Sequence, residues 1–300
     1  MSKFEGVIPA IITPFNKDGS IYIKGIENEI EYLHSYGYNT IFAGGSYGSF
    51  PLIPYKDRLE FNIEVINNCK NLGMKSIIHI GSNSTKEAID LANNAEATGA
   101  DAISSVVPYY YSNSFYDERT FIEYYKEIIN HTSIDLHCYN NPTTTGFNVS
   151  IDFFIKLIDI GIKGIKDGSS DPERIKKMLD ICNPMKIEYY PSSTSSLIIG
   201  FLFGCTSCIS GLALSVPDLV MDIYNLMIDR SVYEAIPLYN KVMKIRSLMG
   251  VKTGRAIAAY SMMNRNGVDV GTCKSPWIPL TYNDAEILFD RIRKIDKEEF

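Results

Sequence analysis

Lys166 is the residue whose type and position most directly suggest chemistry. It stands in Ile162-Lys-Gly-Ile-Lys-Asp-Gly168, a run with the character of a short strand. Period-2 alternation puts Gly164 and Lys166 on one face, whereas Ile165 would pack under helices on the other. Because burying an unpaired ammonium is costly, such a lysine usually has a lowered pKa and can attack carbonyl groups. Pairing with a buried acid is the alternative that stays open.

Three other segments carry polar groups at the ends of predicted strands. Gly44-Gly-Ser-Tyr-Gly-Ser-Phe-Pro51 would form a tight turn whose amides and hydroxyls suit a carboxylate or a phosphate, although a plain turn is equally open. Val106-Val-Pro-Tyr-Tyr-Tyr111 holds three consecutive tyrosines, which cannot all lie in the core because strand residues alternate faces. Tyr139 ends the next strand, where a lone tyrosine is more often a packing residue.

Other residue types that could do chemistry form no convincing pattern. Cys205 and Cys208 stand alone in an apolar run and are expected to be buried rather than to bind zinc or react. The sequence has no Gly-x-x-x-x-Gly-Lys-Ser/Thr loop. No metal-ligand spacing links the histidines, which are His34, His79, His131 and His137. We therefore expect neither a metal nor a bound cofactor.

Short apolar runs alternate with amphipathic stretches over most of the chain. The runs predict eight strands, at residues 7–13, 40–44, 76–81, 102–107, 135–139, 162–166, 187–192 and 208–213. The stretches predict helices at 23–36, 56–72, 85–97, 117–130, 151–160 and 171–182. Eight such repeats favour an α/β fold, a (β/α)₈ TIM barrel, whose active sites lie at the carboxyl ends of the strands. An open doubly wound sheet is the alternative, but no Gly-x-Gly-x-x-Gly follows the first strand.

The helix predicted at 23–36 shows its period most clearly. Ile26, Ile30 and Leu33 share one face, which should pack on the barrel. The glutamates of this helix are expected away from that face, and they are Glu27, Glu29 and Glu31.

The pattern changes after Pro217 to helices only. These are predicted at residues 218–228, 232–249, 253–264 and 284–295. Because no low-complexity linker separates them from the strands, we expect a C-terminal helical extension packed on the barrel. The predicted organisation is a barrel domain of residues 1–217 and a helical domain of residues 218–300.

The composition limits the classes of partner. The 300 residues hold 29 Lys and Arg against 35 Asp and Glu, and this net charge of −6 argues against a nucleic-acid partner. Six cysteines are too few for a disulfide scaffold and fit a reducing cytoplasm. Residues 196–217 lack charges, but their Gly, Ser and Thr content fits a buried helix and strand better than a membrane span. With no signal-peptide pattern before Phe15, we expect a cytoplasmic protein.

Five motifs, in order along the whole chain, resemble those of the dihydrodipicolinate synthase / N-acetylneuraminate lyase family of Schiff-base aldolases. They are Pro9-Ala-Ile-Ile-Thr-Pro-Phe15, Gly45-Ser-Tyr-Gly48, Pro108-Tyr-Tyr110, Tyr139-Asn-x-Pro142 and Gly164-Ile-Lys-Asp167. The resemblance implies a (β/α)₈ barrel with a C-terminal helical domain, usually in a homotetramer built from tight dimers. It also implies that a lysine, here Lys166, forms an imine with pyruvate or another 2-keto acid.

The resemblance also implies roles for individual residues. Tyr139 would transfer protons at the imine centre and the aldol hydroxyl. Ser46, in the turn that contains Gly45, would bind the keto-acid carboxylate through its hydroxyl and the turn's amides. Tyr110 corresponds to a tyrosine that, in the synthases, reaches into the proton relay of the neighbouring subunit. Ile209 corresponds to a residue whose backbone carbonyl faces the substrate.

Departures from the family's motifs bear on the substrate. Synthases that act on aspartate semialdehyde have an arginine where this chain has Thr144, and a threonine cannot make a bidentate charged contact. Sialic acid lyases have an acidic pair where this chain reads Ser192-Ser-Thr-Ser-Ser196, so Ser193 and Thr194 supply hydroxyls instead. Tyr47 replaces a small hydroxyl residue beside the keto-acid pocket, which it could narrow or supply with a phenol donor.

A neutral, hydroxyl-rich pocket favours a polyhydroxy 2-keto-3-deoxy sugar acid over a dicarboxylate. We therefore predict an aldolase that reversibly cleaves such an acid to pyruvate and an aldehyde, with sugar-acid dehydratase chemistry as a variant. The alternative within the family is the synthase that condenses pyruvate with aspartate semialdehyde. The alternative from another class is a non-catalytic barrel that binds a 2-keto acid, and Lys166, Tyr139 and Ser46 together speak against it.

Overall fold

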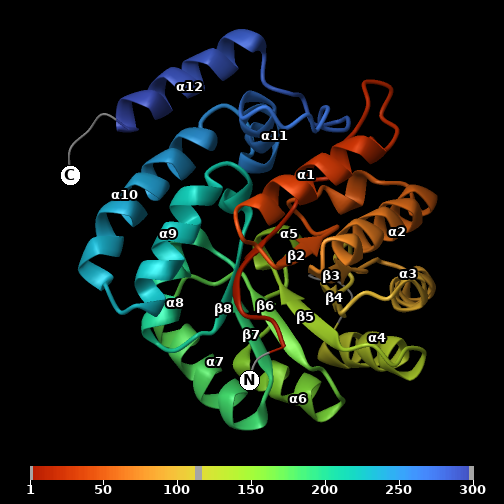
Figure 1. Ribbon diagram of the computed structural model, residues 1–300. Helices are drawn as coiled ribbons and strands as arrows, with labels where there is room; N and C mark the ends of the chain where they lie inside the picture. Colours follow the sequence, from red (N-terminus) through yellow and green to blue (C-terminus); the bar gives the residue numbers. More distant parts are fainter. Residues whose placement is uncertain (1–2, 112–116, 297–300) are drawn as a thin grey trace.

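The computed structural model describes residues 3–111 and 117–296. Within these residues, eight strands occupy the middle of the molecule and helices surround them (Figure 1). The strands are β1 (Gly6–Pro9), β2 (Thr40–Ala43), β3 (Lys75–His79), β4 (Ala102–Ser105), β5 (Leu136–Asn140), β6 (Gly164–Asp167), β7 (Glu188–Pro191) and β8 (Ser207–Ser210). All are buried along most of their length, which explains why their sequences are apolar rather than alternating.

The strands pair in parallel and in the order of the sequence. β2 to β7 form a six-stranded sheet, and β1 pairs with β8. A parallel bridge joins Ala10 to Phe42, and the backbone N–H of Ile11 donates to the Phe42 carbonyl at 3.0 Å, so that β1 connects with β2. On the other side β8 packs beside β7. The predicted (β/α)₈ barrel is confirmed.

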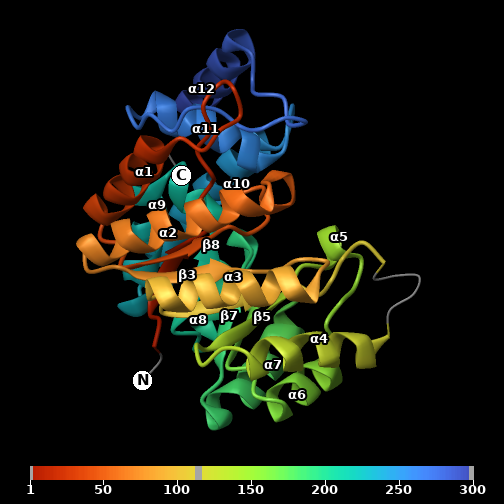
Figure 2. The ribbon, with the colours of Figure 1, turned by 90° about the vertical axis from the view of Figure 1, so that its right-hand side faces the viewer.

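Helices follow the strands and cover the outside of the barrel (Figure 1). They are α1 (Ile23–Ser35), α2 (Tyr55–Asn71), α3 (Thr85–Thr98), α4 (Glu118–Asn130), α5 (Pro142–Thr145), α6 (Ile151–Asp159), α7 (Pro172–Met185) and α8 (Leu197–Leu202). Four more follow β8, and they are α9 (Pro217–Ile228), α10 (Val232–Met249), α11 (Arg255–Arg265) and α12 (Tyr282–Asp296). Figure 2 shows α10, α11 and α12 gathered on one side of the barrel.

The predicted strand at 208–213 ends earlier in the structure. β8 stops at Ser210, and Gly211–Leu214 forms a short 3₁₀ helix instead. The chain turns here because α9 begins at Pro217, directly beyond it. Gly211 also lies close to Tyr47, since a Cβ at this position would come within 2.7 Å of the tyrosine ring. The turn therefore brings the end of β8 against the Gly-Ser loop that follows β2.

One glutamate of α1 lies in the core. Ile26, Ile30 and Leu33 are fully buried, as predicted. Glu29 is fully buried too, and its carboxylate accepts a hydrogen bond from the Ile12 N–H at 3.1 Å. Burial raises the pKa of Glu29 well above its usual value. The expectation that Glu29 lies away from the apolar face was wrong, because the segment after β1 needs an acceptor for a buried amide.

Two findings bear on the environment of the chain. No helix in the described part of the chain is long and apolar enough to cross a membrane. All six cysteines are free and buried, including Cys205 and Cys208. The prediction that these two are buried side chains is confirmed.

Candidate active site

Most of the predicted site residues line one cavity of about 400 Å³. Its lining includes strand-end residues, at the edge of the barrel where active sites of this fold lie. Gly45 and Tyr110 are not among the lining residues. The other predicted site residues do line the cavity, and they are Ser46, Tyr47, Tyr139, Thr144, Lys166, Ser193, Thr194 and Ile209.

Lys166 lies on β6 and lines the cavity, with only 4% of the residue exposed. Its Nζ lies 3.6 Å from the centroid of the Phe42 ring and 4.1 Å from that of the Tyr139 ring. Burial lowers the pKa of Lys166 well below its usual value, because the charged form would lose its hydration. The amine is therefore largely shielded from solvent, close to two aromatic rings, and it lines the cavity.

Asp167, which directly follows the lysine, has a different partner. Its buried carboxylate accepts hydrogen bonds from Arg174 Nε at 2.7 Å and from Asn140 Nδ2 at 2.9 Å. Lys166 makes no hydrogen bond or ion pair with an acid in the described part of the chain. The alternative interpretation, a lysine paired with a buried acid, is therefore wrong.

The Asp167–Arg174 pair anchors the end of β6, and we expect its loss to destabilise the fold. Arg174→Met would leave a buried carboxylate without its cation, which should lower the free energy of unfolding by about 3–5 kcal/mol. Urea titration measures this change. The control is Lys177→Met on the same helix, because the Lys177–Glu173 pair is exposed and should contribute about 1 kcal/mol or less. Equal losses in the two variants would contradict the anchoring role.

A hydrogen-bond network joins Tyr139 of β5 to the turn after β2. Asn141 Nδ2 donates to the Tyr139 hydroxyl at 3.2 Å and to Ser46 Oγ at 3.0 Å. Burial raises the pKa of Tyr139 to about 12, although hydrogen bonds from Ser46 and Asn141 oppose the shift. The phenol is thus protonated at neutral pH and lies beside the buried amine of Lys166. The sequence motif contained Asn141, but only its contacts identify it as a site residue.

Gly45 contributes to the site through its backbone. A Cβ at this position would come within 2.5 Å of Phe42 Cε1, and Phe42 in turn contacts Lys166 Nζ. The preceding Gly44 has a φ of +67°, a conformation that favours glycine. These two residues let the turn lie close to Phe42 and direct Ser46 into the cavity.

Tyr110 lies outside the cavity, with 74% of the residue exposed. Its backbone N–H donates to Asn83 Oδ1 at 2.9 Å, and its ring packs edge-on against Tyr111 at 4.8 Å between centroids. Tyr109 instead turns inward, and its ring packs against Phe50 at 5.7 Å. The expectation that the three tyrosines do not all belong to the core is confirmed. Tyr110 does not line the cavity of its own chain, and its role in the site of a neighbouring subunit stays a prediction.

The C-terminal helices add two basic residues that sequence reasoning missed. Arg246 of α10 and Arg255, the first residue of α11, both line the cavity. Tyr47 connects with this wall, because its hydroxyl donates to the Arg255 carbonyl at 3.3 Å. The cavity lining contains no Asp or Glu among the described residues. The prediction of a neutral pocket was therefore wrong, since no local pattern marks a helical arginine that folds back over the barrel.

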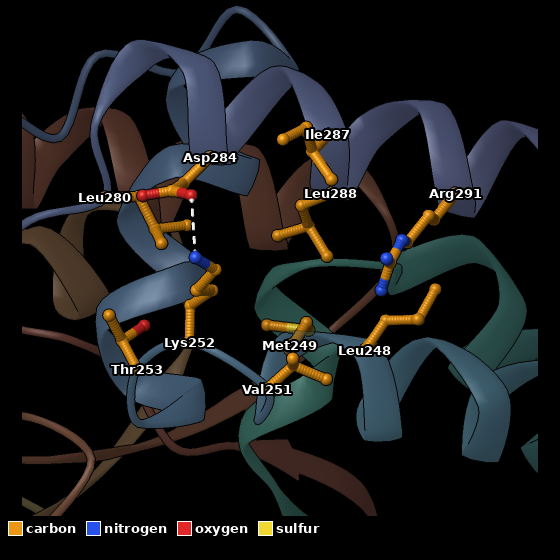
Figure 3. A pocket seen from close by; sticks show the side chains of 10 residues that line it. All are labelled: Leu248, Met249, Val251, Lys252, Thr253, Leu280, Asp284, Ile287, Leu288 and Arg291. Carbon is orange, nitrogen blue, oxygen red and sulfur yellow. Dashed lines mark ion pairs between the residues drawn. The ribbon is translucent and has the colours of Figure 1, made fainter.

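A second cavity, of about 90 Å³, lies among the C-terminal helices (Figure 3). Apolar side chains of α10 and α12, such as Leu248 and Leu288, line it together with the ion pair of Lys252 and Asp284. No strand-end residue reaches it. Nowhere in the described residues do three or more His, Cys, Asp or Glu side chains gather as a metal site would need. The larger cavity is therefore the candidate active site.

A barrel that holds a buried lysine and a phenol at its strand ends belongs to the class of proteins suited to imine chemistry on carbonyl compounds. The particular family follows from the sequence. This chain belongs to the dihydrodipicolinate synthetase family, whose profile matches residues 3–294.

Comparisons with individual proteins agree. The 4-hydroxy-tetrahydrodipicolinate synthase of Brachyspira hyodysenteriae is 30% identical over 303 residues, which cover 98% of each chain. The crystal structure of YagE, a prophage protein of the dihydrodipicolinic acid synthase family from E. coli K12 in complex with pyruvate, matches with a TM-score of 0.91 and 22% identity. That match covers 98% of this chain and 99% of YagE. CdNal from Clostridium difficile, solved with mannosamine, matches with a TM-score of 0.90 and 23% identity over 97% and 99% of the two chains.

The family confirms the enzyme class that the sequence motifs predicted. Its members are lyases and synthases of the pyruvate-dependent aldolase type, and they act on small keto acids. The particular substrate of this chain does not follow from the family, which contains both synthases and sialic acid lyases.

Proposed function

We propose that Lys166 of this chain forms an imine with a 2-keto acid and that the enzyme makes or breaks the bond between C3 and C4 of the adduct. The observation that carries the proposal is the buried Lys166 amine, 4.1 Å from the ring centroid of Tyr139 in a cavity that Ser46 also lines. A neutral amine is the form that attacks a carbonyl, and burial of Lys166 favours it.

The proposed reaction proceeds in four steps. Lys166 Nζ adds to the C2 carbonyl to give a carbinolamine, whose hydroxyl leaves as water with the proton of Tyr139, so that a protonated imine and a phenolate remain. The phenolate takes the proton of the C4 hydroxyl, the C3–C4 bond breaks, and its electron pair moves into the imine. An aldehyde leaves, and Tyr139 gives the proton it has taken to C3 of the enamine, so that a protonated imine and a phenolate remain again. Water then hydrolyses the imine, which releases pyruvate and the free amine, and the proton set free in this step returns to Tyr139.

The remaining residues would bind the substrate. Ser46 and the amides of the Gly45 turn would hold the keto-acid carboxylate, since paired amides and a hydroxyl suit an anion. The Ile209 carbonyl would face the reacting end. Hydroxyls at the cavity wall would contact the tail of the substrate, and they come from Tyr47, Thr144, Ser193 and Thr194.

These hydroxyls support a 2-keto-3-deoxy sugar acid as the substrate, cleaved reversibly to pyruvate and an aldehyde. Thr143, Ser170 and Ser192 add three more hydroxyls to the lining. A second candidate is the condensation of pyruvate with aspartate semialdehyde. Two observations favour it, namely the similarity in sequence to 4-hydroxy-tetrahydrodipicolinate synthases and the presence of Arg246 and Arg255 in the cavity.

We also propose the setting in which the enzyme works. The barrel of residues 1–217 would carry the reacting groups, and the helices of residues 218–300 would close the cavity from outside. A homotetramer, built as a dimer of dimers, would give exposed Tyr110 a neighbouring site to reach. Free, buried cysteines support a cytoplasmic enzyme. Its partner would be a small 2-keto acid, with neither nucleic acid nor membrane involved.

A substrate panel tests the choice between the two candidates. The purified enzyme is given a 2-keto-3-deoxy sugar acid, N-acetylneuraminate, or pyruvate with aspartate semialdehyde, and pyruvate release or consumption is followed. We expect kcat/KM for the sugar acid to exceed the others by about tenfold or more, the effect of one well-placed polar contact. Faster consumption of the semialdehyde would reject the sugar acid in favour of the synthase.

A further inference from the structure

The guanidinium groups of the arginine pair, Arg246 and Arg255, are unpaired among the residues that the structure describes. Arg246 is half-buried, and Arg255 is exposed at the cavity. Neither guanidinium makes an ion pair or a hydrogen bond to any residue that the structure describes. By contrast, the largely buried Arg174 donates to Asp167 and to the carbonyl of Val149.

The two charges act on each other. Burial, and after it the charge of Arg255, lowers the pKa of Arg246. Two like charges at one wall, with no acid in the lining to balance them, are unfavourable unless an anion binds there. A guanidinium presents planar, paired N–H donors, which match the oxygens of a carboxylate or a phosphate.

The arginine pair and the reacting groups come from different parts of the fold. Lys166, Tyr139 and Ser46 come from strand ends, whereas the arginine pair comes from helices that pack outside the barrel. Tyr47 lies with the arginines, since it donates to the Arg255 carbonyl and its ring packs against Gly211. A ligand that reaches Lys166 with its keto end has the arginine pair available for its other end.

We propose that Arg246 and Arg255 bind a second anionic group, a carboxylate or a phosphate, at the end of the substrate remote from its keto group. The orientation of the substrate in this inference rests on the imine chemistry proposed above. The inference narrows the 2-keto-3-deoxy sugar acid proposed above to one with an anion at each end, which the hydroxyls of the cavity wall alone would not select.

Direct binding tests the subsite without requiring turnover. Glycerol 3-phosphate, glycerate and glycerol are each titrated into the enzyme with pyruvate present, and heat is measured. We expect one of the two anions to bind about tenfold or more tightly than glycerol. Tighter binding of glycerol 3-phosphate indicates a phosphate ester as substrate, and tighter binding of glycerate indicates a dicarboxylic acid. No preference for either anion over glycerol would overturn the proposal.

Variants assign the effect to the two residues. Arg246→Gln and Arg255→Gln should each remove most of the preference for the anion. The matched control is Arg265→Gln, which changes an arginine of α11 that pairs with Glu286 outside the cavity. This variant should bind the anion as the unchanged enzyme does. Equal loss in the control, or unchanged binding in both cavity variants, would reject the subsite.

Borohydride trapping of pyruvate separates failure of this inference from failure of the proposed function. Arg246→Gln and Arg255→Gln should still form the pyruvate adduct at the rate of the unchanged enzyme, because Ser46 holds the keto-acid end. Slower trapping in proportion to the lost anion binding would show that the arginines hold the keto-acid carboxylate itself, and would overturn the inference. Absence of trapping in the unchanged enzyme would reject the imine chemistry, while the titrations would still decide whether an anion site exists.

Discussion

Lys166→Met is expected to abolish both the pyruvate adduct and turnover. Both proteins are incubated with pyruvate and borohydride, digested, and their peptides are weighed by mass spectrometry. In the unchanged enzyme the added mass should be on the peptide that contains Lys166, and in the variant no peptide should carry it. Loss of the covalent nucleophile should lower kcat/KM on the order of 10⁴-fold or more. A label that persists in the variant would remove Lys166 from the mechanism.

Lys163→Met is the matched control for this experiment. Lys163 lies in the same segment, but it is exposed and precedes β6, on the face opposite to Lys166. Its variant should be labelled and should turn over as the unchanged enzyme does. Loss of the label in both variants would indicate damage to the strand rather than loss of the nucleophile.

The lowered pKa of Lys166 gives this prediction a pH dependence. Because the attacking amine must be neutral, kcat/KM should rise with pH through the lowered pKa and then level off below the usual lysine value of 10.5. A rate that climbs steadily toward pH 10.5 would show that the amine is not perturbed.

The free energy of unfolding should depend on pH because of the same lowered pKa of Lys166. Between the lowered pKa and 10.5 the unfolded chain binds a proton that the folded chain does not, so the free energy of unfolding rises with pH in this window. Methionine at position 166 has no proton to lose. The Lys166→Met variant should therefore be at least as stable as the unchanged protein, with the difference shrinking as the pH approaches 10.5. This result would separate loss of activity from loss of fold.

The Tyr139→Phe variant should still form the imine but should turn over more slowly. The variant loses only the hydroxyl that accepts from Asn141 and lies beside Lys166, and the ring remains to pack against Phe42. Without the proton carrier, kcat should fall by about 10²–10⁴-fold, the usual contribution of a general acid or base. Pyruvate trapping should still occur, more slowly. Normal turnover in this variant would remove Tyr139 from the mechanism.

Tyr190→Phe is the control for the tyrosine. Tyr190 lies on the neighbouring strand, in register with Lys166, and is fully buried, but it does not line the cavity. Its loss of a hydroxyl should change stability more than kcat. A comparable fall in kcat for both variants would mean that the loss of activity comes from altered packing of the barrel rather than from the missing Tyr139 hydroxyl.

Much of the reactive centre followed from local patterns. Strand residues alternate faces, so the period alone predicted that Lys166 and Ile165 point in opposite directions. Parallel strands in a barrel end at one edge, so the turn with Ser46 and the strand end with Tyr139 were expected at the same edge as the lysine. Eight of the ten predicted residues line the cavity, although the resemblance to the family rather than strand geometry gave most of them their roles. The eight strands fall within a few residues of their predicted positions.

The errors share a cause. Glu29 was expected away from the apolar face because helical periodicity treats each glutamate as a surface residue, whereas a backbone amide from another segment pairs with it inside. The neutral pocket was expected because only the motif residues at the strand ends were considered, whereas Arg246 and Arg255 reach the cavity from helices that follow the barrel. In both cases the deciding side chain or amide comes from a part of the chain that is distant in sequence.

The sequence by itself determined the barrel, the buried lysine with its tyrosine, and the family, because these depend on strand period, strand order and short motifs. Only the tertiary structure decided the charge of the pocket. Arg246 and Arg255 lie in helices whose pattern looks like that of any surface helix, and they become site residues only when α10 and α11 pack beside the mouth of the barrel. Local backbone geometry encodes which face a strand residue occupies, but helix packing encodes which distant side chains share its cavity.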